Sequence, residues 1–145
     1  MEEMLSAYAD AVRAKDADAF LGLYADDVRN FDLWSEWSYD GKDALRGMVG
    51  EWFGSLPDDE VVSVRFDEVR TQAGEDVAAV SAFTTFAAES PDGTELRSMN
   101  NRLTWILRKD ADGTARKACS LCAIAHHRAR SGNAPGAASN RASAG

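Results

Sequence analysis

The sequence of 145 residues has little positive charge and no long apolar run. Before Arg128 it holds 13 basic and 24 acidic side chains, which gives this part a net charge of −11. Nucleic-acid binding draws on clusters of Lys and Arg, so we expect no nucleic-acid partner. No apolar stretch is long enough to span a bilayer, and the N-terminus MEEMLSAYAD is acidic rather than signal-like. We therefore expect a cytoplasmic protein with no membrane partner.

Cysteine is also scarce, with Cys119 and Cys122 in the stretch CSLC. A redox-active pair opens a helix after a strand, and a structural zinc site needs four ligands. His126 and His127 follow, but the last cysteine of a zinc knuckle is missing. We interpret the two cysteines as small core residues. Because the chain also has no glycine-rich nucleotide motif, we predict neither a metal nor a cofactor.

Three helices are predicted from apolar residues that recur every three or four positions. The segment Glu2–Ala14 places Leu5, Tyr8 and Val12 on one face. Asp16 is a suitable cap for a second helix, whose apolar residues are Phe20, Leu21, Leu23 and Tyr24. The third helix starts at Lys42 and carries the most regular pattern in the chain, formed by Leu45, Met48, Val49, Trp52 and Phe53.

Strands are predicted where the apolar period changes to two. A short strand is expected at Val28–Asp32, and alternation at Val62–Phe66 starts a series of long ones. The segment Val77–Ala88 is apolar or small throughout, which predicts a strand covered on both faces. The turn sequences SPDG and DADG then separate the strands Leu96–Lys109 and Arg116–Ala125.

The strand Leu96–Lys109 has one face with Met99, Asn101, Leu103, Trp105 and Leu107, and another with Arg102, Thr104 and Ile106. If the second face lines a pocket, Arg102 would bind a carboxylate or enolate, or pair with Asp32. If it faces outward, Arg102 is a surface or dimer-contact residue. The alternation of side chains allows both.

Helices gathered before a series of hairpins predict an α+β fold with an antiparallel sheet. A strongly curved sheet wrapped on a few helices leaves a concavity, where a small organic ligand would bind. We expect one domain over residues 1–127. Residues 128–145 are rich in Ala, Gly, Ser and Arg without periodicity, so we predict a flexible tail.

Three stretches resemble a known family: YADAVRAKDADAFLGLYADDVRNFD (8–32), GKDALRGMVGEWF (41–53) and NRLTWILRKDADG (101–113). They are similar to the ketosteroid isomerase-like and SnoaL-like polyketide cyclase-like superfamily. The resemblance implies the cone-shaped nuclear transport factor 2-like (cystatin-like) fold and a homodimer formed through the sheet. It also implies a cofactor-free isomerase or cyclase.

In this alignment the tyrosine of the family's first helix falls on Tyr8, and the proton-transferring aspartate falls on Asp32. The resemblance therefore implies Asp32 as catalytic base and Tyr8 as donor to a developing enolate oxygen. From the residues alone, Asp32 has two other interpretations, a pocket-lining carboxylate without a catalytic role or a loop carboxylate that caps a turn, and Tyr8 is alternatively an ordinary core residue. The alternative function is a non-catalytic ligand-binding or dimeric assembly module.

An apolar wall around Asp32 would favour its neutral form and suit proton transfer. Trp34, Trp37 and Tyr39 are candidates for this wall, or else the two tryptophans plug the open end of the cone. The full set of predicted substrate-binding residues is Tyr24, Trp34, Trp37, Trp52, Arg102, Thr104 and His126.

The chain departs from the family pattern in two places. Where ketosteroid isomerases carry a second acidic donor, this chain has Trp105, Ile106 and Leu107. After Gly113 the family's tryptophan is missing and the two histidines are adjacent. Two hypotheses account for this end of the chain: divergence from the family, or a shifted reading frame in the gene.

Overall fold

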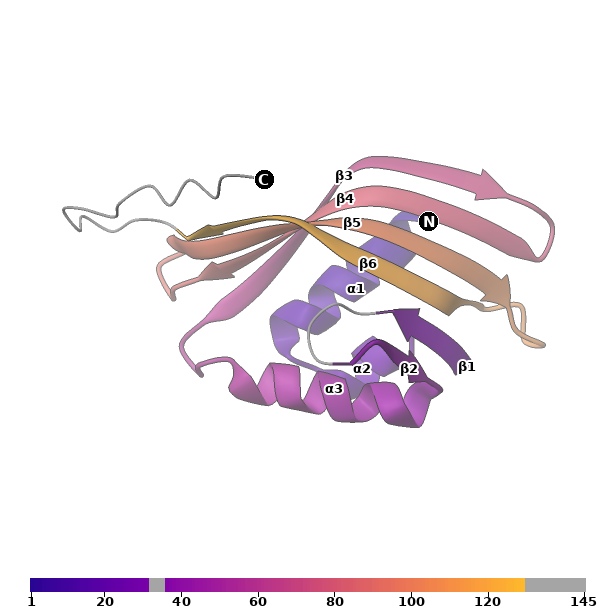
Figure 1. Cartoon of the computed structure of the whole chain (residues 1–145), viewed down its shortest axis with the longest axis horizontal. Coiled ribbons are helices and arrows are strands. Elements are labelled where there is room, and N and C mark those ends of the chain that lie inside the picture. The colour runs from indigo at the N-terminus through magenta and orange to yellow at the C-terminus, as the bar shows by residue number, and fades with distance from the viewer. Residues whose placement is uncertain (32–35, 130–145) are drawn as a thin grey trace, which may run out of the picture.

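The computed structural model describes residues 1–31 and 36–129, with side chains through residue 121. Within this part, three helices lie against the concave side of one strongly curved sheet of six strands (Figure 1). This arrangement confirms the predicted α+β cone-shaped fold, in which the helices cover one face of the sheet.

Helix α1 (Glu2–Ala14) has the predicted bounds and buries Tyr8 and Val12. Helix α2 (Ala17–Leu21) has the predicted cap, because the Asp16 carboxylate accepts a hydrogen bond of 3.0 Å from the Ala19 amide. The prediction that this helix extends to Tyr24 is wrong. The Leu23 carbonyl accepts a hydrogen bond of 2.9 Å from the Lys117 amide, so the chain has already joined the sheet.

Helix α3 (Lys42–Ser55) confirms the third predicted helix. Its apolar residues divide into two ridges. Leu45, Val49 and Phe53 are buried in the core, whereas Met48 and Trp52 are half-buried beside a cavity. One helix therefore supports the core and also forms one wall of the cavity.

The strands have the spatial order β2-β1-β6-β5-β4-β3. Their bounds are β1 Tyr24–Phe31, β2 Ser38–Asp40, β3 Val61–Ala73, β4 Val77–Glu89, β5 Glu95–Lys109 and β6 Ala115–Ala129. The pair β1–β6 is parallel and the other described pairs are antiparallel. The sheet is therefore mixed rather than purely antiparallel as predicted, and β2 is a strand that the sequence did not indicate.

Both predicted hairpin turns are present. Gly93 and Gly113 have φ angles of 83° and 80°, which glycine adopts without a steric penalty. Each glycine amide donates a hydrogen bond of 2.9 Å to the carbonyl three residues before it, at Ser90 and Asp110. These turns fix the register of β4, β5 and β6.

Strand β6 runs to Ala129, two residues beyond the predicted end of the domain. Residues 130–145 of the predicted tail lie outside the described part of the chain. No helix in that described part is both long and apolar enough to cross a bilayer.

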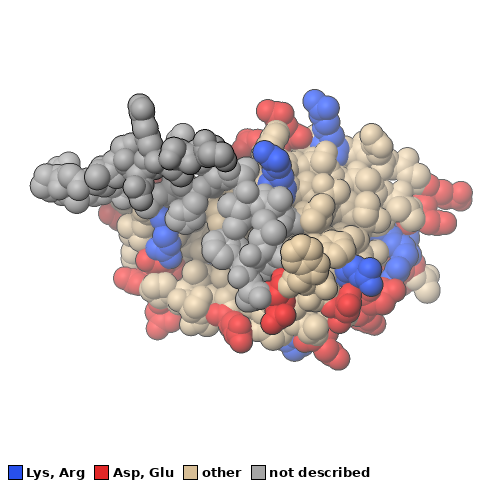
Figure 2. Space-filling model, in the orientation of Figure 1, with Lys and Arg blue, Asp and Glu red and all other residues tan. Residues whose placement is uncertain are grey.

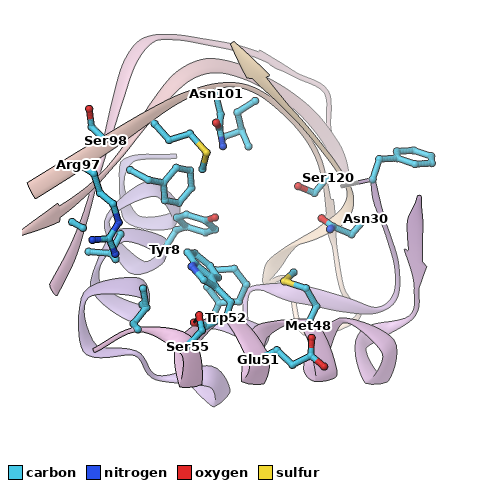
Figure 3. A pocket seen from close by; sticks show the side chains of 18 of the residues that line it. Tyr8, Asn30, Met48, Glu51, Trp52, Ser55, Arg97, Ser98, Asn101 and Ser120 are labelled. Carbon is cyan, nitrogen blue, oxygen red and sulfur yellow. Dashed lines mark hydrogen bonds between the residues drawn. The ribbon is translucent and has the colours of Figure 1, made fainter. Parts of the chain in front are cut away.

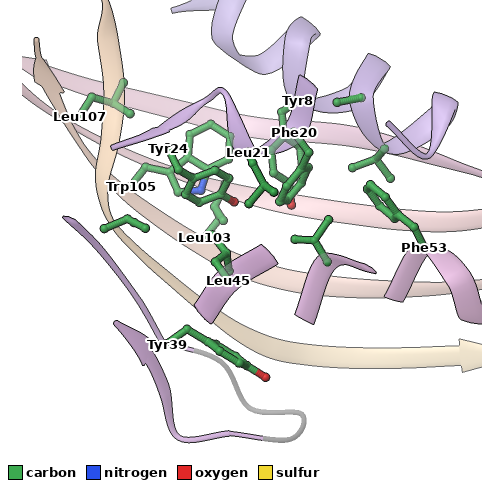
Figure 4. Packing of buried hydrophobic residues seen from close by; sticks show 14 of the residues in the cluster. Tyr8, Phe20, Leu21, Tyr24, Tyr39, Leu45, Phe53, Leu103, Trp105 and Leu107 are labelled. Carbon is green, nitrogen blue, oxygen red and sulfur yellow. The ribbon is translucent and has the colours of Figure 1, made fainter. Parts of the chain in front are cut away.

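The core lies between the helices and the inner face of the sheet (Figure 4). Trp105 is fully buried, with its ring centroid 5.3 Å from that of Tyr8. Within the single chain, the prediction that β4 is covered on both faces is wrong. Val80 and Thr84 are buried on its inner face, but Phe83 on the outer face is 48% exposed.

Candidate functional site

A cavity of about 550 Å³ opens between α1, α3 and the concave face of the sheet (Figure 3). Its volume is in the range typical of small-molecule sites. Most of its surface is apolar, and the apolar residues that line it are Tyr8, Phe20, Tyr24, Phe31, Met48, Trp52, Leu56, Val62, Phe86, Ala88, Met99 and Leu103. Such a wall favours a flat, mostly apolar ligand.

Tyr8 comes from the buried face of α1 and points its hydroxyl group into the cavity (Figure 3). Its ring is fixed by the rings of Phe20 and Trp105, with centroids 5.0 and 5.3 Å away. Packing on several sides limits rotation of the ring. The phenol group is therefore held in place before a ligand arrives, which favours directional hydrogen bonding.

Three buried polar side chains line the sheet side of the cavity: Asn30, Asn101 and Ser120. Asn30 and Ser120 are direct partners in the parallel pair of β1 and β6. Asn101 comes from β5 and is only 3% exposed. These groups give an otherwise apolar wall several positions that can bind ligand oxygens or nitrogens.

Charged side chains lie toward the rim. Arg97 donates two hydrogen bonds to the Glu60 carboxylate, of 3.2 and 2.7 Å, in a bidentate pair. These bonds hold the pKa of Glu60 below its usual value, although desolvation acts in the opposite direction. Glu51 of α3 lies on the other side of the cavity (Figure 3).

Behind the inner wall lies Lys117 of β6, which is fully buried. Its Nζ atom is 3.6 Å from the ring centroid of Trp105, 4.0 Å from that of Tyr8 and 4.4 Å from that of Tyr24. It also donates a hydrogen bond of 3.4 Å to the Tyr24 hydroxyl. Two of these three aromatic residues, Tyr8 and Tyr24, line the cavity themselves.

The structure brings some of the predicted site residues together. Tyr8, Tyr24 and Trp52 all line the cavity. Asp32 and Trp34 lie outside the described residues. His126 belongs to β6, but its side chain is likewise outside the described part.

Three predicted substrate-binding residues lie elsewhere. Trp37 is 86% exposed before β2 and does not line the cavity. Tyr39, the third residue expected in the aromatic wall, is buried in β2 and does not line the cavity either. Arg102 and Thr104 are exposed on the outer face of β5, because Asn101, Leu103 and Trp105 occupy its inner face. The structure therefore places Arg102 on the outer face, which is the second of the two alternatives. The prediction that Arg102 binds a ligand in this cavity is wrong.

Sequence reasoning missed Asn101 and Lys117 as site residues. For Asn101 a signal existed, since it is a polar residue on the predicted inner face between Met99 and Leu103. For Lys117 there was none. Strand β6 has an irregularity between Lys117 and Cys119, so that Lys117 and Ser120 are both buried although they are three residues apart.

No metal site is evident among the residues that the structure describes, where no three His, Cys, Asp or Glu side chains come together to hold an ion. Cys119 is a free thiol and half-buried. The side chains of Cys122, His126 and His127 lie outside the described part, so the interpretation of Cys122 as a core residue stays a prediction.

Comparison with known proteins identifies the family. The model of the SnoaL-like domain matches residues 1–113, which is most of the chain. The chain belongs to the SnoaL-like family. The match ends before β6, so Lys117 and Ser120 lie beyond it. No functionally curated protein matches this SnoaL-like chain significantly.

Solved structures share the fold. An NTF2-like protein of unknown function from Pseudomonas putida KT2440 has a TM-score of 0.71 and 19% identity over 84% of this chain and 82% of the other. A ketosteroid isomerase-like protein from Erwinia carotovora atroseptica SCRI1043 has a TM-score of 0.62 and 23% identity, over 85% of this chain and 92% of the other. A protein of unknown function with a cystatin-like fold from Nostoc punctiforme has a TM-score of 0.68 and 14% identity, over 86% of this chain and 87% of the other. At these identities the likeness establishes the fold of this SnoaL-like protein and not its activity.

Proposed function

We propose that this SnoaL-like protein is a cofactor-independent isomerase or cyclase that moves a proton on a small, mostly apolar carbonyl compound. The observation that carries the proposal is the cavity of about 550 Å³ with the Tyr8 hydroxyl directed into it. Apolar walls exclude water and strengthen electrostatic interactions inside the cavity. A fixed phenol in such a place suits the stabilisation of charge on a ligand oxygen.

The proposed reaction starts with removal of a proton from a carbon beside the carbonyl group. The Asp32 carboxylate takes this proton, and the C–H electron pair forms a C=C bond as the carbonyl oxygen gains negative charge. Tyr8 donates a hydrogen bond to that oxygen. Return of the proton from Asp32 to another carbon of the conjugated system completes an isomerisation. The role of Asp32 is carried over from the family resemblance.

The experiment uses a nitrobenzisoxazole, which opens to a coloured phenolate when its ring C–H proton is removed. We expect the wild-type protein to accelerate the opening and Asp32→Asn to lower the rate about a hundredfold. The matched control is Asp40→Asn, since Asp40 is an exposed carboxylate of β2 paired with Arg29 at 3.0 Å. An unchanged rate in Asp32→Asn would show that Asp32 is not the base.

A second candidate function is a dimeric assembly module, and the outer face of the sheet favours it. Phe83 and Leu121 are each 48% exposed there. They are the cross-strand partners of Arg102 and Thr104, so the four side chains form one continuous patch over β4, β5 and β6. We propose that a second copy of the chain covers this patch, which would explain why the sequence of β4 is apolar on both faces. Dimerisation is compatible with catalysis in the cavity on the opposite face.

A further inference from the structure

The side chains of Asn30 and Ser120 form a polar pair in the wall of the cavity. Asn30 is 8% exposed and Ser120 is 4% exposed, and the two residues are direct partners across β1 and β6. Both side chains point into the cavity, on the other side from Tyr8 and Arg97 (Figure 3). The pairing of the two strands therefore places two buried polar groups side by side on one wall.

The fold does not use the hydrogen-bonding capacity of this pair. Within the part of the chain that the structure describes, no hydrogen bond to the side chain of Asn30 or Ser120 is found. Buried polar groups in proteins are nearly always hydrogen-bonded, because burial removes them from bulk water. Since both groups face the cavity, they are available to a molecule that binds there.

The chemistry of the pair defines the ligand group that fits it. The Asn30 carboxamide holds N–H donors and an oxygen acceptor, and the Ser120 hydroxyl group is likewise both a donor and an acceptor. Neighbouring strands lie about 4.8 Å apart, so both side chains can reach one ligand atom. A hydroxyl oxygen is a single atom that accepts from one side chain and donates to the other, whereas a carbonyl or ether oxygen can only accept.

The charges around the cavity favour a neutral hydroxyl group. Among the described residues, the charged ones that line the cavity are Glu51 and Arg97. Arg97 lies on the opposite side and is already paired with Glu60 at 2.7 Å (Figure 3). Asp32, the proposed base, follows Asn30 by two residues, and a carboxylate disfavours a second negative charge nearby.

We propose that Asn30 and Ser120 form a subsite that binds a neutral hydroxyl group of the substrate. This inference rests on the proposed function and names the substrate class. The substrate is a mostly apolar ring compound with a carbonyl group at the reacting end and a hydroxyl group at the other end. The two residues position the substrate, because binding of its hydroxyl group decides which end faces Tyr8.

Two probes of nearly the same shape test the subsite. In 4-hydroxyacetophenone a carbonyl group and a hydroxyl group lie at opposite ends of a ring, and 4-fluoroacetophenone has fluorine in place of the hydroxyl group. In mildly acidic buffer, where the phenol keeps its proton, calorimetric titration should show about tenfold tighter binding of the hydroxyl probe by the wild type. Asn30→Leu and Ser120→Ala should each lower this preference about fivefold.

The melting temperature distinguishes a binding role from a structural one. Because the two side chains make no hydrogen bond within the described part of the protein, neither Asn30→Leu nor Ser120→Ala should lower it. Thr84→Val is the matched control. Thr84 is a buried residue of β4 whose hydroxyl oxygen also lacks a partner in the described part, but it does not line the cavity. This variant should leave the preference for the hydroxyl probe unchanged.

Equal binding of both probes by the wild type would overturn the subsite and leave the proposed pocket intact. An unchanged preference in both Asn30→Leu and Ser120→Ala would do the same, as would an equal loss of preference in Thr84→Val. Should Asn30→Leu fail to fold, Ser120→Ala decides, because it removes a single atom. Binding of neither probe would overturn the pocket and this inference together.

Discussion

Asn30 of β1 lies directly opposite Ser120 of β6. The parallel pairing of these two strands brings the first and the last strand of the sheet together at the cavity. Both side chains are buried and line the same wall (Figure 3). They are 90 residues apart in sequence, so no local pattern joins them. The cavity is therefore a product of the sheet topology, and its walls are distinct from the core of the protein.

Tyr8→Phe should weaken binding of para-nitrophenol about tenfold, because it removes a hydrogen-bond donor to an oxygen of this probe. The ring contacts with Phe20 and Trp105 remain, so the melting temperature should change little. Titration of the probe by absorbance measures the affinity. Tyr39→Phe is the control, since Tyr39 is also buried but does not line the cavity. Equal effects of the two variants would contradict a role for Tyr8 in binding.

The two ridges of α3 should respond differently to truncation. Leu45 is fully buried, so Leu45→Ala should lower the free energy of unfolding by about 3 kcal/mol. Met48 is half-buried at the cavity, so Met48→Ala should cost about 1 kcal/mol but alter affinity for para-nitroanisole. Urea unfolding and probe titration measure the two quantities. The assignment of the ridges is wrong if Leu45→Ala changes affinity while Met48→Ala does not.

Phe83→Glu should convert a dimer into a monomer, because it places a charge in the proposed interface on the outer face of the sheet. Light scattering across a range of protein concentrations measures the mass. Trp37→Glu is the control, since Trp37 is more exposed but lies before β2, outside the patch of Phe83, Arg102, Thr104 and Leu121. A wild-type chain that is monomeric at all concentrations would exclude this interface.

The pair of Glu60 and Arg97 should make stability depend on acid pH. Hydrogen bonds from Arg97 lower the pKa of Glu60 in the folded protein. The pair therefore stabilises the fold above the ordinary pKa of a glutamate, and this stabilisation disappears as the pH falls through the lowered value. Glu60→Gln should melt at a lower temperature than the wild type near neutral pH, and the difference should shrink in acid.

Thermal unfolding measured from neutral to acid pH tests this expectation. Glu95→Gln is the matched control, because Glu95 is an exposed carboxylate at the start of β5. A difference between Glu60→Gln and the wild type that persists unchanged into acid would show that the carboxylate charge does not contribute.

Much of the fold could be predicted because its signals are local. The bounds of α1, the Asp16 cap, the pattern of α3 and both glycine turns each depend on residues a few positions apart. The predictions failed where distant pairing decides the structure. Tyr24 is apolar and continues a helical pattern, yet it lies in a strand because β6 is available beside it. Strand β2 is three residues long and is likewise held by its pairing with β1.

The candidate site shows the same division. Tyr8 and Trp52 were predicted and line the cavity, since helical periodicity indicates which face of α1 or α3 is buried. Arg102 and Thr104 were misassigned because alternation along a strand does not say which face is the inner one. Inner and outer faces of β5 are set by the direction in which the sheet curves around the helices (Figure 1).

The acidic composition and the −8 net charge follow from the sequence by itself, and Figure 2 shows acidic side chains spread along the side of the molecule where α3 lies. The sequence also determined the helices, the long strands and the resemblance to the SnoaL-like family, because these depend on short-range periodicity and motifs. Only the tertiary structure decided that Lys117 lies behind Tyr8 and Tyr24. An irregularity in β6 and its parallel pairing with β1 bring that lysine under the cavity, and both arise from contacts between residues far apart in the chain.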